Sequence, residues 1–221
     1  MALFHSLVEH YDNFYTNEES DVILDYLKTL DYNRTYYYMY GKVSESPRSM
    51  KWFCDDPSRT YVFSRTHIDG LTPEPFTPEL NKIKQKIEDI TGQKFNALLI
   101  NKYETGTDKI AWHSDNDAWC GDKFVVPSLS FGATRKFQLR QKTDHKKKVS
   151  YDLTHGSLIV MKDDCQTHLE HAILPQKTVK EQRFNLTFRN IIPSIQGRKA
   201  SQTWEKLIER GVVRLDDPRI Q

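Results

Sequence analysis

The sequence lacks any apolar run long enough to cross a membrane. No stretch approaches the roughly 18 apolar residues that a spanning helix needs. Its first residues, MALFHSLVEH, are too short and too mixed in polarity for a secretory signal. We therefore expect an intracellular protein, nuclear or cytoplasmic, that is neither secreted nor bound to a membrane.

The sequence also has few cysteines and a small net charge. The three cysteines, Cys54, Cys120 and Cys165, are odd in number, far apart and form no Cys-x-x-Cys pair, which favours buried reduced thiols over a disulfide or zinc framework. A net charge of +2 on 221 residues is too small to indicate nucleic acid by itself. Because 28% of the residues are charged and 12% are aromatic, the composition is that of a folded domain with a real core.

Two helices are marked in the first 93 residues. Thr16 and Glu19 form a capping box for the first, and the second begins at Thr77 and Pro78 and ends at Gly92. Between them, residues 36–42 (YYYMYGK) are followed by a polar connection and by residues 60–66 (TYVFSRT), which we interpret as a strand.

From residue 95 onward the apolar pattern changes to a period of two. It predicts eight short strands, at FNALLINKY, KIAWHSD, VVPSLSF, RKFQLRQ, VSYDL, SLIVM, THLEH and RFNLTFRN. Short antiparallel strands after two helices predict an α+β fold: a jelly-roll (double-stranded β-helix) core buttressed by N-terminal helices. We divide the chain into residues 1–93, the core at 94–193, and a helical extension at 194–221, with Ser201 as its cap and Gly211 as its end.

The stretch IAWHSDND, residues 110–117, raises the possibility of a metal site. On a strand, His113, Asp115 and Asp117 would share one face, so a His-x-Asp pair can offer two ligands to one ion. The later histidines that could supply a third ligand are His155, His168 and His171. The first precedes a glycine in an expected turn, whereas HAILP places His171 at a strand end. Two histidines and one carboxylate are the ligands of non-haem Fe(II) oxygenases, although the spacing alone leaves the choice open.

The strand RFNLTFRN has two contrasting faces. Phe184, Leu186 and Phe188 form one that must be core. The opposite face carries Arg183, Asn185, Thr187 and Arg189. If that face looks into the jelly roll, its arginines need an anionic partner, and a dicarboxylic acid would supply one. The alternative is a solvent-facing strand whose arginines pair with surface acids. In LLINKY, Asn101 and Tyr103 share a face in the same way.

Taken as a set, Asn-x-Tyr, His-x-Asp, a later His and Arg-x-Asn-x-Thr-x-Arg resemble the AlkB family of Fe(II)- and 2-oxoglutarate-dependent dioxygenases. That family removes alkyl groups from nucleic-acid bases, and the resemblance runs from about residue 36 to residue 192. SLSFGATRKFQLR and HGSLIVM look most like its vertebrate DNA- and RNA-repair members.

The resemblance implies a role for each motif residue. It implies that His113, Asp115 and His171 hold Fe(II), with 2-oxoglutarate and O₂ as co-substrates. It further implies that Arg189, Asn101 and Tyr103 bind the distal carboxylate of 2-oxoglutarate, and that the pocket is completed by Arg183, Asn185 and Thr187.

The resemblance also implies a base pocket. Residues 61–63 would belong to a nucleotide-recognition lid in residues 1–93: Tyr61 and Phe63, which flank Val62, would clamp an extruded base opposite His113. Asp117 falls where the family carries an acid that faces the base, while Asn116 departs from the acid common in close relatives and leaves the base preference open.

A finger that inserts into the base stack is the other implied element of substrate recognition. Tyr40 would be inserted, with Gly41 making the turn and Lys42 near phosphate. An amphipathic strand with packed tyrosines is the alternative for residues 36–40. Residues 140–148 (RQKTDHKKK) and, more weakly, Arg48 are candidates for phosphate contacts.

The reaction that this resemblance implies is oxidative demethylation of 1-methyladenine or 3-methylcytosine in DNA or RNA, DNA being favoured. It would release formaldehyde, succinate and CO₂, and we expect the enzyme to be a monomer. Three alternatives remain: the same chemistry on a protein or lipid, a zinc hydrolase with the same three ligands, and a non-catalytic nucleic-acid-binding module.

Overall fold

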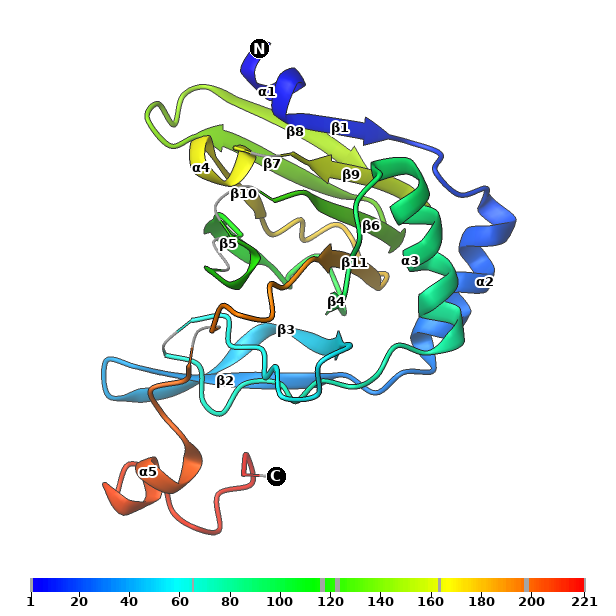
Figure 1. The fold of residues 1–221 in the computed structure, drawn as a ribbon. Helices are drawn as coiled ribbons and strands as arrows, with labels where there is room; N and C mark the ends of the chain where they lie inside the picture. Colours follow the sequence, from blue (N-terminus) through cyan, green and yellow to red (C-terminus); the bar gives the residue numbers. More distant parts are fainter. Residues whose placement is uncertain are drawn as a thin grey trace.

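Two antiparallel sheets form the body of the protein in the computed structural model, which describes residues 2–64, 66–115, 118–121, 124–162, 164–196 and 199–220 (Figure 1). The seven-stranded sheet runs in the order β1 (Val8–Tyr11), β9 (Ser157–Met161), β6 (Val126–Gly132), β11 (Arg183–Arg189), β4 (Ala97–Tyr103), β3 (Lys42–Cys54) and β2 (Asn33–Met39). The four-stranded sheet runs in the order β5 (Ile110–His113), β10 (Leu169–Ile173), β7 (Arg135–Gln141) and β8 (Lys148–Leu153). The predicted α+β class and jelly-roll core are confirmed.

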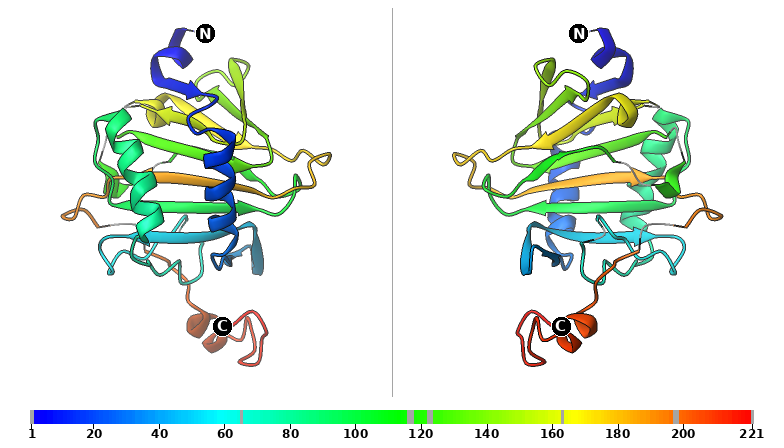
Figure 2. Two further views of the ribbon diagram at one scale, coloured as in Figure 1. Left: turned by 90° about the vertical axis from the view of Figure 1, so that its right-hand side faces the viewer. Right: turned by 90° about the vertical axis from the view of Figure 1, so that its left-hand side faces the viewer.

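Two helices cover the outer face of the large sheet, α2 (Asn17–Lys28) and α3 (Pro78–Thr91) (Figure 2). Thr16 and Glu19 make both hydrogen bonds of the capping box, and Gly92 ends α3 at a φ of 65°. The short helical elements are α1 (Ala2–Leu7), the 3₁₀ helix η1 (Ala118–Cys120), α4 (Cys165–His168) and α5 (Trp204–Glu209). None of the helices in the described ranges is long and apolar enough to cross a membrane.

The strand β11 separates the hydrophobic core from the interior of the jelly roll. All seven of its residues are buried. Phe184, Leu186 and Phe188 pack into the cluster that lies under α2 and α3. The alternate residues, including Arg183 at 1% exposed and Arg189 at 2%, face the space between the two sheets. The alternative of solvent-facing arginines is therefore excluded.

The structure differs from the sequence predictions in several details. Thr167 and His168, expected in the strand THLEH, belong to the helix α4. Residues 43–54, expected as part of a polar connection, belong to the long strand β3, and among the described residues of 60–66, expected as a strand, Tyr61 makes an isolated bridge and no regular strand is present. The short elements α1 and β1 were not anticipated. The cap of α5 is Thr203 and not Ser201, because the Thr203 side chain accepts the hydrogen bond from the third residue of the helix.

Candidate functional site

Two strands of the small sheet bring the candidate metal ligands together. His113 ends β5 and lies opposite His171 in β10. Asp115 lies two residues beyond the strand, and its Oδ1 is 3.5 Å from His113 Nε2 and 3.8 Å from His171 Nε2. One ligand atom from each residue lies within 4.8 Å of the others, which suits a single ion. The expectation that one strand face holds the pair was wrong, because β5 ends before Asp115.

Hydrogen bonds from neighbouring backbone fix the triad. Gln166 Oε1 accepts a 2.7 Å hydrogen bond from the Asp115 backbone N–H, and the Ser114 hydroxyl donates to the Leu169 carbonyl at 2.8 Å. His113 Nδ1 lies 2.8 Å from the Ala111 carbonyl, so it carries the proton and leaves Nε2 free to bind a metal. Gln166 and Ser114 were not predicted to support the triad, because Gln166 belongs to no recognisable motif and Ser114 is the variable residue of His-x-Asp.

The triad has the protonation states that a metal requires. Burial alone would raise the pKa of the Asp115 carboxyl, but Arg189 and the two imidazoles hold that pKa well below its usual range. Burial, reinforced by the neighbouring His113, lowers the pKa of His171 to about 3. At neutral pH the site thus offers a carboxylate and a neutral imidazole, the forms that coordinate metal ions.

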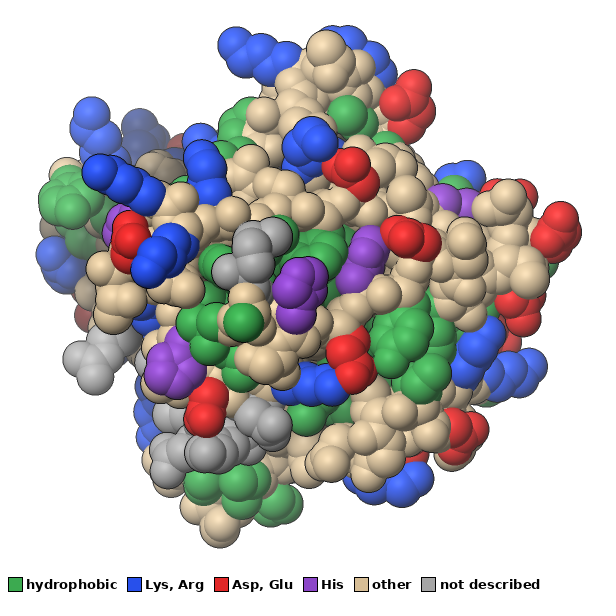
Figure 3. All heavy atoms as spheres, turned by 90° about the horizontal axis from the view of Figure 1, so that it is seen from above, with side chains coloured by type: hydrophobic (Ala, Val, Ile, Leu, Met, Phe, Trp, Pro, Cys, Tyr) green, Lys and Arg blue, Asp and Glu red, His purple; other side chains and the backbone are tan. Residues whose placement is uncertain are grey.

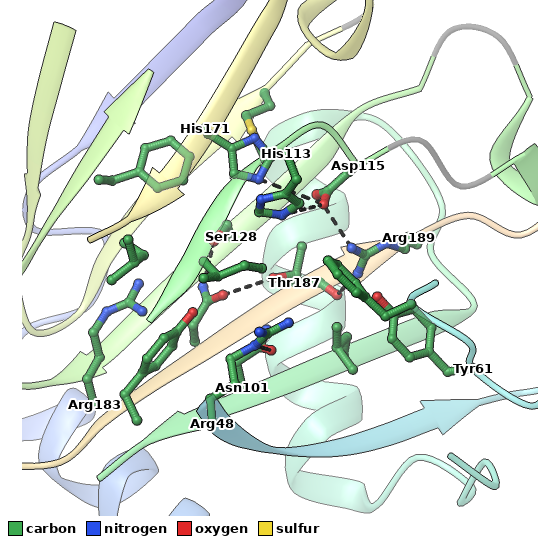
Figure 4. Close-up of a pocket in the computed structure, with 18 residues that line it drawn as sticks. Arg48, Tyr61, Asn101, His113, Asp115, Ser128, His171, Arg183, Thr187 and Arg189 are labelled. Atoms are coloured by element: carbon green, nitrogen blue, oxygen red, sulfur yellow. Dashed lines mark hydrogen bonds and ion pairs between the residues drawn. The ribbon is translucent and has the colours of Figure 1, made fainter. Parts of the chain in front are cut away.

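The far end of the same cavity contains a buried guanidinium (Figure 4). Arg183 Nη2 donates to Ser130 Oγ at 2.8 Å, and the guanidinium carbon lies 5.2 Å from the centre of the Tyr103 ring. Within the described part of the chain, Arg183 Nε and Nη1 donate no hydrogen bond. Burial lowers the pKa of Arg183 to about 10, so it remains charged at neutral pH. Two open donors on a buried cation fit a carboxylate.

The second arginine of β11 has a different position. Arg189 Nη2 lies 3.4 Å from Asp115 Oδ2, at the metal end of the cavity. The sequence had placed Arg189 with Asn101 and Tyr103, but the residue beside Tyr103 is Arg183. Of the two β11 arginines, Arg183 lies at the Tyr103 end of the cavity and Arg189 lies beside Asp115.

Polar side chains line the wall between the two ends. Asn185 Nδ2 donates to Ser128 Oγ at 2.6 Å and to the Leu129 carbonyl at 3.0 Å, and the Thr187 hydroxyl donates to Asn185 Oδ1 at 3.1 Å. These bonds order the wall of the cavity between its two ends.

Arg48 belongs to this cavity and not to the molecular surface. It is 3% exposed, its Nε donates to Asn101 Oδ1 at 2.6 Å, and its guanidinium lies 5.4 Å from the Phe63 ring centre. The suggestion that Arg48 contacts phosphate was therefore wrong, because its side chain is turned inward from β3.

The predicted lid residues have unequal positions. The Phe63 ring meets the His113 ring edge to face at 5.8 Å and lines the cavity. Tyr61 also lines the cavity but is only 2% exposed, and its ring lies 4.9 Å from Trp52 and 6.3 Å from Trp119. Val62 is 4% exposed. The packing of Trp52 and Trp119 against Tyr61 was not predicted. Asn116 and Asp117, which were predicted to contact the base, lie outside the described residues.

The predicted finger is a tight turn at the tip of the β2–β3 hairpin. Tyr40 has a φ of 51° and Gly41 of 76°, as two-residue hairpin turns require. Tyr40 is 98% exposed and Lys42 is also exposed. The alternative of packed tyrosines holds for Tyr36, whose ring meets Trp204, but not for Tyr40.

The predicted basic hairpin is the β7–β8 turn. Arg140 is held by Glu170 at 2.8 Å and lies 4.1 Å from the Trp112 ring centre, whereas Lys146, Lys147 and Lys148 are exposed. On the face shown in Figure 3, Lys and Arg side chains lie on all sides, and most of the acidic side chains lie toward the right. The exposed lysines of the β7–β8 turn remain predicted phosphate contacts.

Comparison with known proteins identifies the family. The model described as the 2OG-Fe(II) oxygenase superfamily matches residues 8–189. The mouse protein named alpha-ketoglutarate-dependent dioxygenase alkB homolog 3 is 32% identical over 197 residues, 85% of this chain and 67% of that protein. The chain belongs to the AlkB family of 2OG-Fe(II) oxygenases. Family membership and the fit of the triad confirm the prediction of Fe(II), 2-oxoglutarate and O₂.

Other AlkB relatives show a similar degree of identity. The mouse DNA oxidative demethylase ALKBH2 is 36% identical over 163 residues, and the human alkB homolog 3 is 35% identical over 162. These alignments cover 71% and 69% of this chain but only 66% and 54% of the two relatives. A solved structure described as OsALKBH1 superposes with a TM-score of 0.59 at 18% identity, covering 83% of this chain and 97% of that one, and supports the fold.

Proposed function

We propose that this chain oxidatively demethylates N-alkylated bases of the 1-methyladenine and 3-methylcytosine type in DNA or RNA. The observation that carries the proposal is a single cavity with His113, Asp115 and His171 at one end and the buried, under-bonded Arg183 at the other. Fe(II) with 2-oxoglutarate and O₂ supplies oxidation of an N-methyl group, whose loss as formaldehyde accompanies formation of succinate and CO₂.

The chain's own residues hold and orient the reactants. Three protein ligands leave open metal positions for the co-substrates. Arg183, whose Nε and Nη1 have no protein partner in the described residues, would hold the distal carboxylate of 2-oxoglutarate beside Tyr103, while Asn101, Asn185 and Thr187 order the wall. This set of contacts fixes the co-substrate in one orientation, which is how positioning lowers a reaction barrier.

The base enters from the side of the lid. The rings of Phe63 and His113, which meet edge to face, line that side of the cavity. The Tyr61 ring, which packs on Trp52, lies behind them. A base methylated on its pairing edge cannot pair normally, so extruding it costs less than extruding an intact base. Tyr40 fills the gap that extrusion leaves in a duplex. Asp117 and Asn116 remain predicted base contacts.

The relatives' names support this choice of substrate. Mouse ALKBH2 is named a DNA oxidative demethylase. DNA is accordingly the favoured substrate, with RNA as the second. We further propose that the protein acts as a monomer in the nucleus or cytoplasm. A zinc hydrolase is less favoured, because hydrolysis would give Arg183 no anionic partner.

Mass spectrometry of methylated oligonucleotides tests the function. The protein is incubated with Fe(II), ascorbate, 2-oxoglutarate and matched oligonucleotides carrying 1-methyladenine or 3-methylcytosine as single-stranded DNA, duplex DNA or RNA. We expect loss of the methyl group in at least one form. Asp115→Ala abolishes turnover because it removes a metal ligand, whereas Asp25→Ala, at a side chain that is 77% exposed, preserves it.

Succinate formation separates the alternatives. Production of succinate with every methylated oligonucleotide left intact would contradict the nucleic-acid substrate and favour a protein or lipid substrate. Absence of 2-oxoglutarate binding, measured by calorimetry with Mn(II), would contradict the reaction class itself.

A further inference from the structure

The hairpin that carries Tyr40 projects beyond the sheet that supports it. The strands β2 and β3 pair from Asn33 and Met50 to Met39 and Lys42, whereas β3 pairs with β4 only from Ser49 to Cys54. Residues 36–45 are therefore a two-stranded ribbon. Such a ribbon is marginally stable in water unless a third strand or a packed face supports it.

The lid gives the ribbon its first support. The Tyr38 backbone N–H donates to the Thr66 carbonyl at 2.8 Å, and the Ile68 N–H donates to the Tyr36 carbonyl at 2.8 Å. Between these bonds the Tyr37 and His67 rings stack at 5.0 Å. Residues 66–68, which follow the lid, therefore extend the sheet along the free edge of β2 and join the lid to the ribbon.

The C-terminal segment gives the second support. Gln202 bridges Ile68 in parallel, and its carbonyl accepts from the Asp69 N–H at 3.3 Å. The core of the contact is a separate apolar cluster of Ile68, Leu207 and Val213, against which Tyr36, Tyr38, Val43 and Trp204 pack. Figures 1 and 2 show α5 below the end of β2, away from the rest of the body.

Aromatic contacts tie α5 directly to the ribbon. The Trp204 ring meets the Tyr36 ring edge to face at 5.5 Å, and the Arg210 guanidinium lies 5.4 Å from the centre of the Tyr38 ring. Tyr36 and Tyr38 stand on the strand that leads to Tyr40, so α5 packs on the base of the finger.

A second anchor joins the start of this segment to the rim of the cavity. The Ile192 N–H donates to the carbonyl of Trp119 at 2.8 Å. Arg59, just before the lid, donates from Nη1 to the Ile195 carbonyl at 2.8 Å and from Nη2 to the Pro193 carbonyl. The C-terminal segment thus contacts three parts of the chain that are distant in sequence: the lid region, η1 and the hairpin.

We propose that residues 192–196 and 199–213 form a strap that holds the hairpin and lid in the position from which Tyr40 engages nucleic acid. This inference rests on the proposed function for its nucleic-acid part. The family match ends at residue 189, so the strap lies outside the part of the chain that the superfamily model covers. Leu207, fully buried in the separate cluster, is its main positioning residue.

Hydrogen exchange tests the strap without any catalytic readout. Leu207→Ala opens the separate cluster, and we expect amide exchange at Tyr38 and Ile68 to become about tenfold faster or more, while the β4 and β11 amides are unchanged. Leu215→Ala makes the same change in a side chain that is 78% exposed and is the matched control. Unchanged exchange at Tyr38 and Ile68 in Leu207→Ala would overturn the strap.

Kinetics on duplex substrate test what the strap is for. We expect Leu207→Ala to raise KM for a methylated duplex about tenfold with kcat and 2-oxoglutarate affinity unchanged, as loss of substrate positioning predicts. In a Tyr40→Ala background the same substitution adds no further rise in KM, because both act through one finger. Trp204→Ala, which removes the edge-to-face contact with Tyr36 and part of the packing on the cluster, gives a smaller rise of the same kind.

The two proposals fail in distinguishable ways. If no methylated oligonucleotide is a substrate, the proposed function fails, and faster exchange in Leu207→Ala alone still supports the strap as a brace of the hairpin. If the duplex is a substrate and its KM is the same in Leu207→Ala and in the parent protein, the strap's role in recognition is overturned while the function stands.

Discussion

Replacing Arg183 by methionine should stabilise the ligand-free protein and weaken 2-oxoglutarate binding. The methionine keeps most of the side-chain volume and removes a charge that burial disfavours. That cost is visible in the pKa of Arg183, lowered from 12.5 to about 10, a difference of about 3 kcal/mol in the free energy of the charged form. The substitution also loses the hydrogen bond to Ser130, worth about 1 kcal/mol.

The net effect on the free energy of unfolding is therefore a gain of about 1–3 kcal/mol without ligand, in line with other replacements of buried charge. For a chain of this size that corresponds to a rise in Tm of roughly 2–4 °C per kcal/mol. Two hydrogen bonds to a carboxylate are worth about 3 kcal/mol or more together, so 2-oxoglutarate affinity should fall about 100-fold or more.

Thermal unfolding measures both effects on one sample series. With Mn(II) present, 2-oxoglutarate at 100 times its Kd should stabilise the parent protein by about 2.7 kcal/mol and Arg183→Met by far less. Arg214→Met, at a side chain that is 87% exposed, should behave as the parent. A ligand-free Tm below the parent's, or equal protection of both proteins by 2-oxoglutarate, would refute the assignment of Arg183.

Three further outcomes follow from the site and its surroundings. Burial lowers the pKa of His67 from 6.5 to about 4, so between these pH values the unfolded chain binds more protons than the folded protein. The free energy of unfolding should therefore fall by up to about 3 kcal/mol as the pH drops from 6.5 to 4. Chemical denaturation of His67→Asn should show a shallower fall over the same range. Gln166→Ala removes the acceptor of the Asp115 N–H and should weaken Mn(II) binding about 10–100-fold by calorimetry, whereas an unchanged Kd would exclude a positioning role. Tyr40→Ala should reduce turnover of methylated duplex about 10–100-fold and of single strands little, with Tyr40→Phe retaining activity, and equal losses on both substrates would remove the finger.

Local signals in the sequence were sufficient for much of the fold. The capping box at Thr16 and the left-handed Gly92 depend on residues within one turn, so they are readable without tertiary structure. The alternation in β11 was equally clear, because three large apolar side chains must face the core. The same alternation correctly placed both arginines inside the jelly roll.

The roles of the two arginines could not be read in the same way. Arg183 and Arg189 share a strand face but stand six residues apart, which is roughly 20 Å along a strand. Which of them lies near the metal depends on the direction of β11 relative to the small sheet, and that is a property of the whole topology. The pairing of Arg183 with Tyr103 and of Arg189 with Asp115 needed the structure.

The strand β3 was missed for a related reason. Its outer half stands in a two-stranded ribbon that is largely exposed and is not covered by the continuous core, so it lacks the apolar alternation that identifies a strand. Gln166 gave no signal at all, because its contact with Asp115 spans 51 residues of sequence.

A crystal structure with Mn(II) and 2-oxoglutarate tests the central claim most directly. The account predicts the ion between His113, Asp115 and His171, with the distal carboxylate of 2-oxoglutarate on Arg183 beside Tyr103 and the lid side of the metal left open for a base. An ion bound elsewhere, or a distal carboxylate that rests on Arg189, would contradict it.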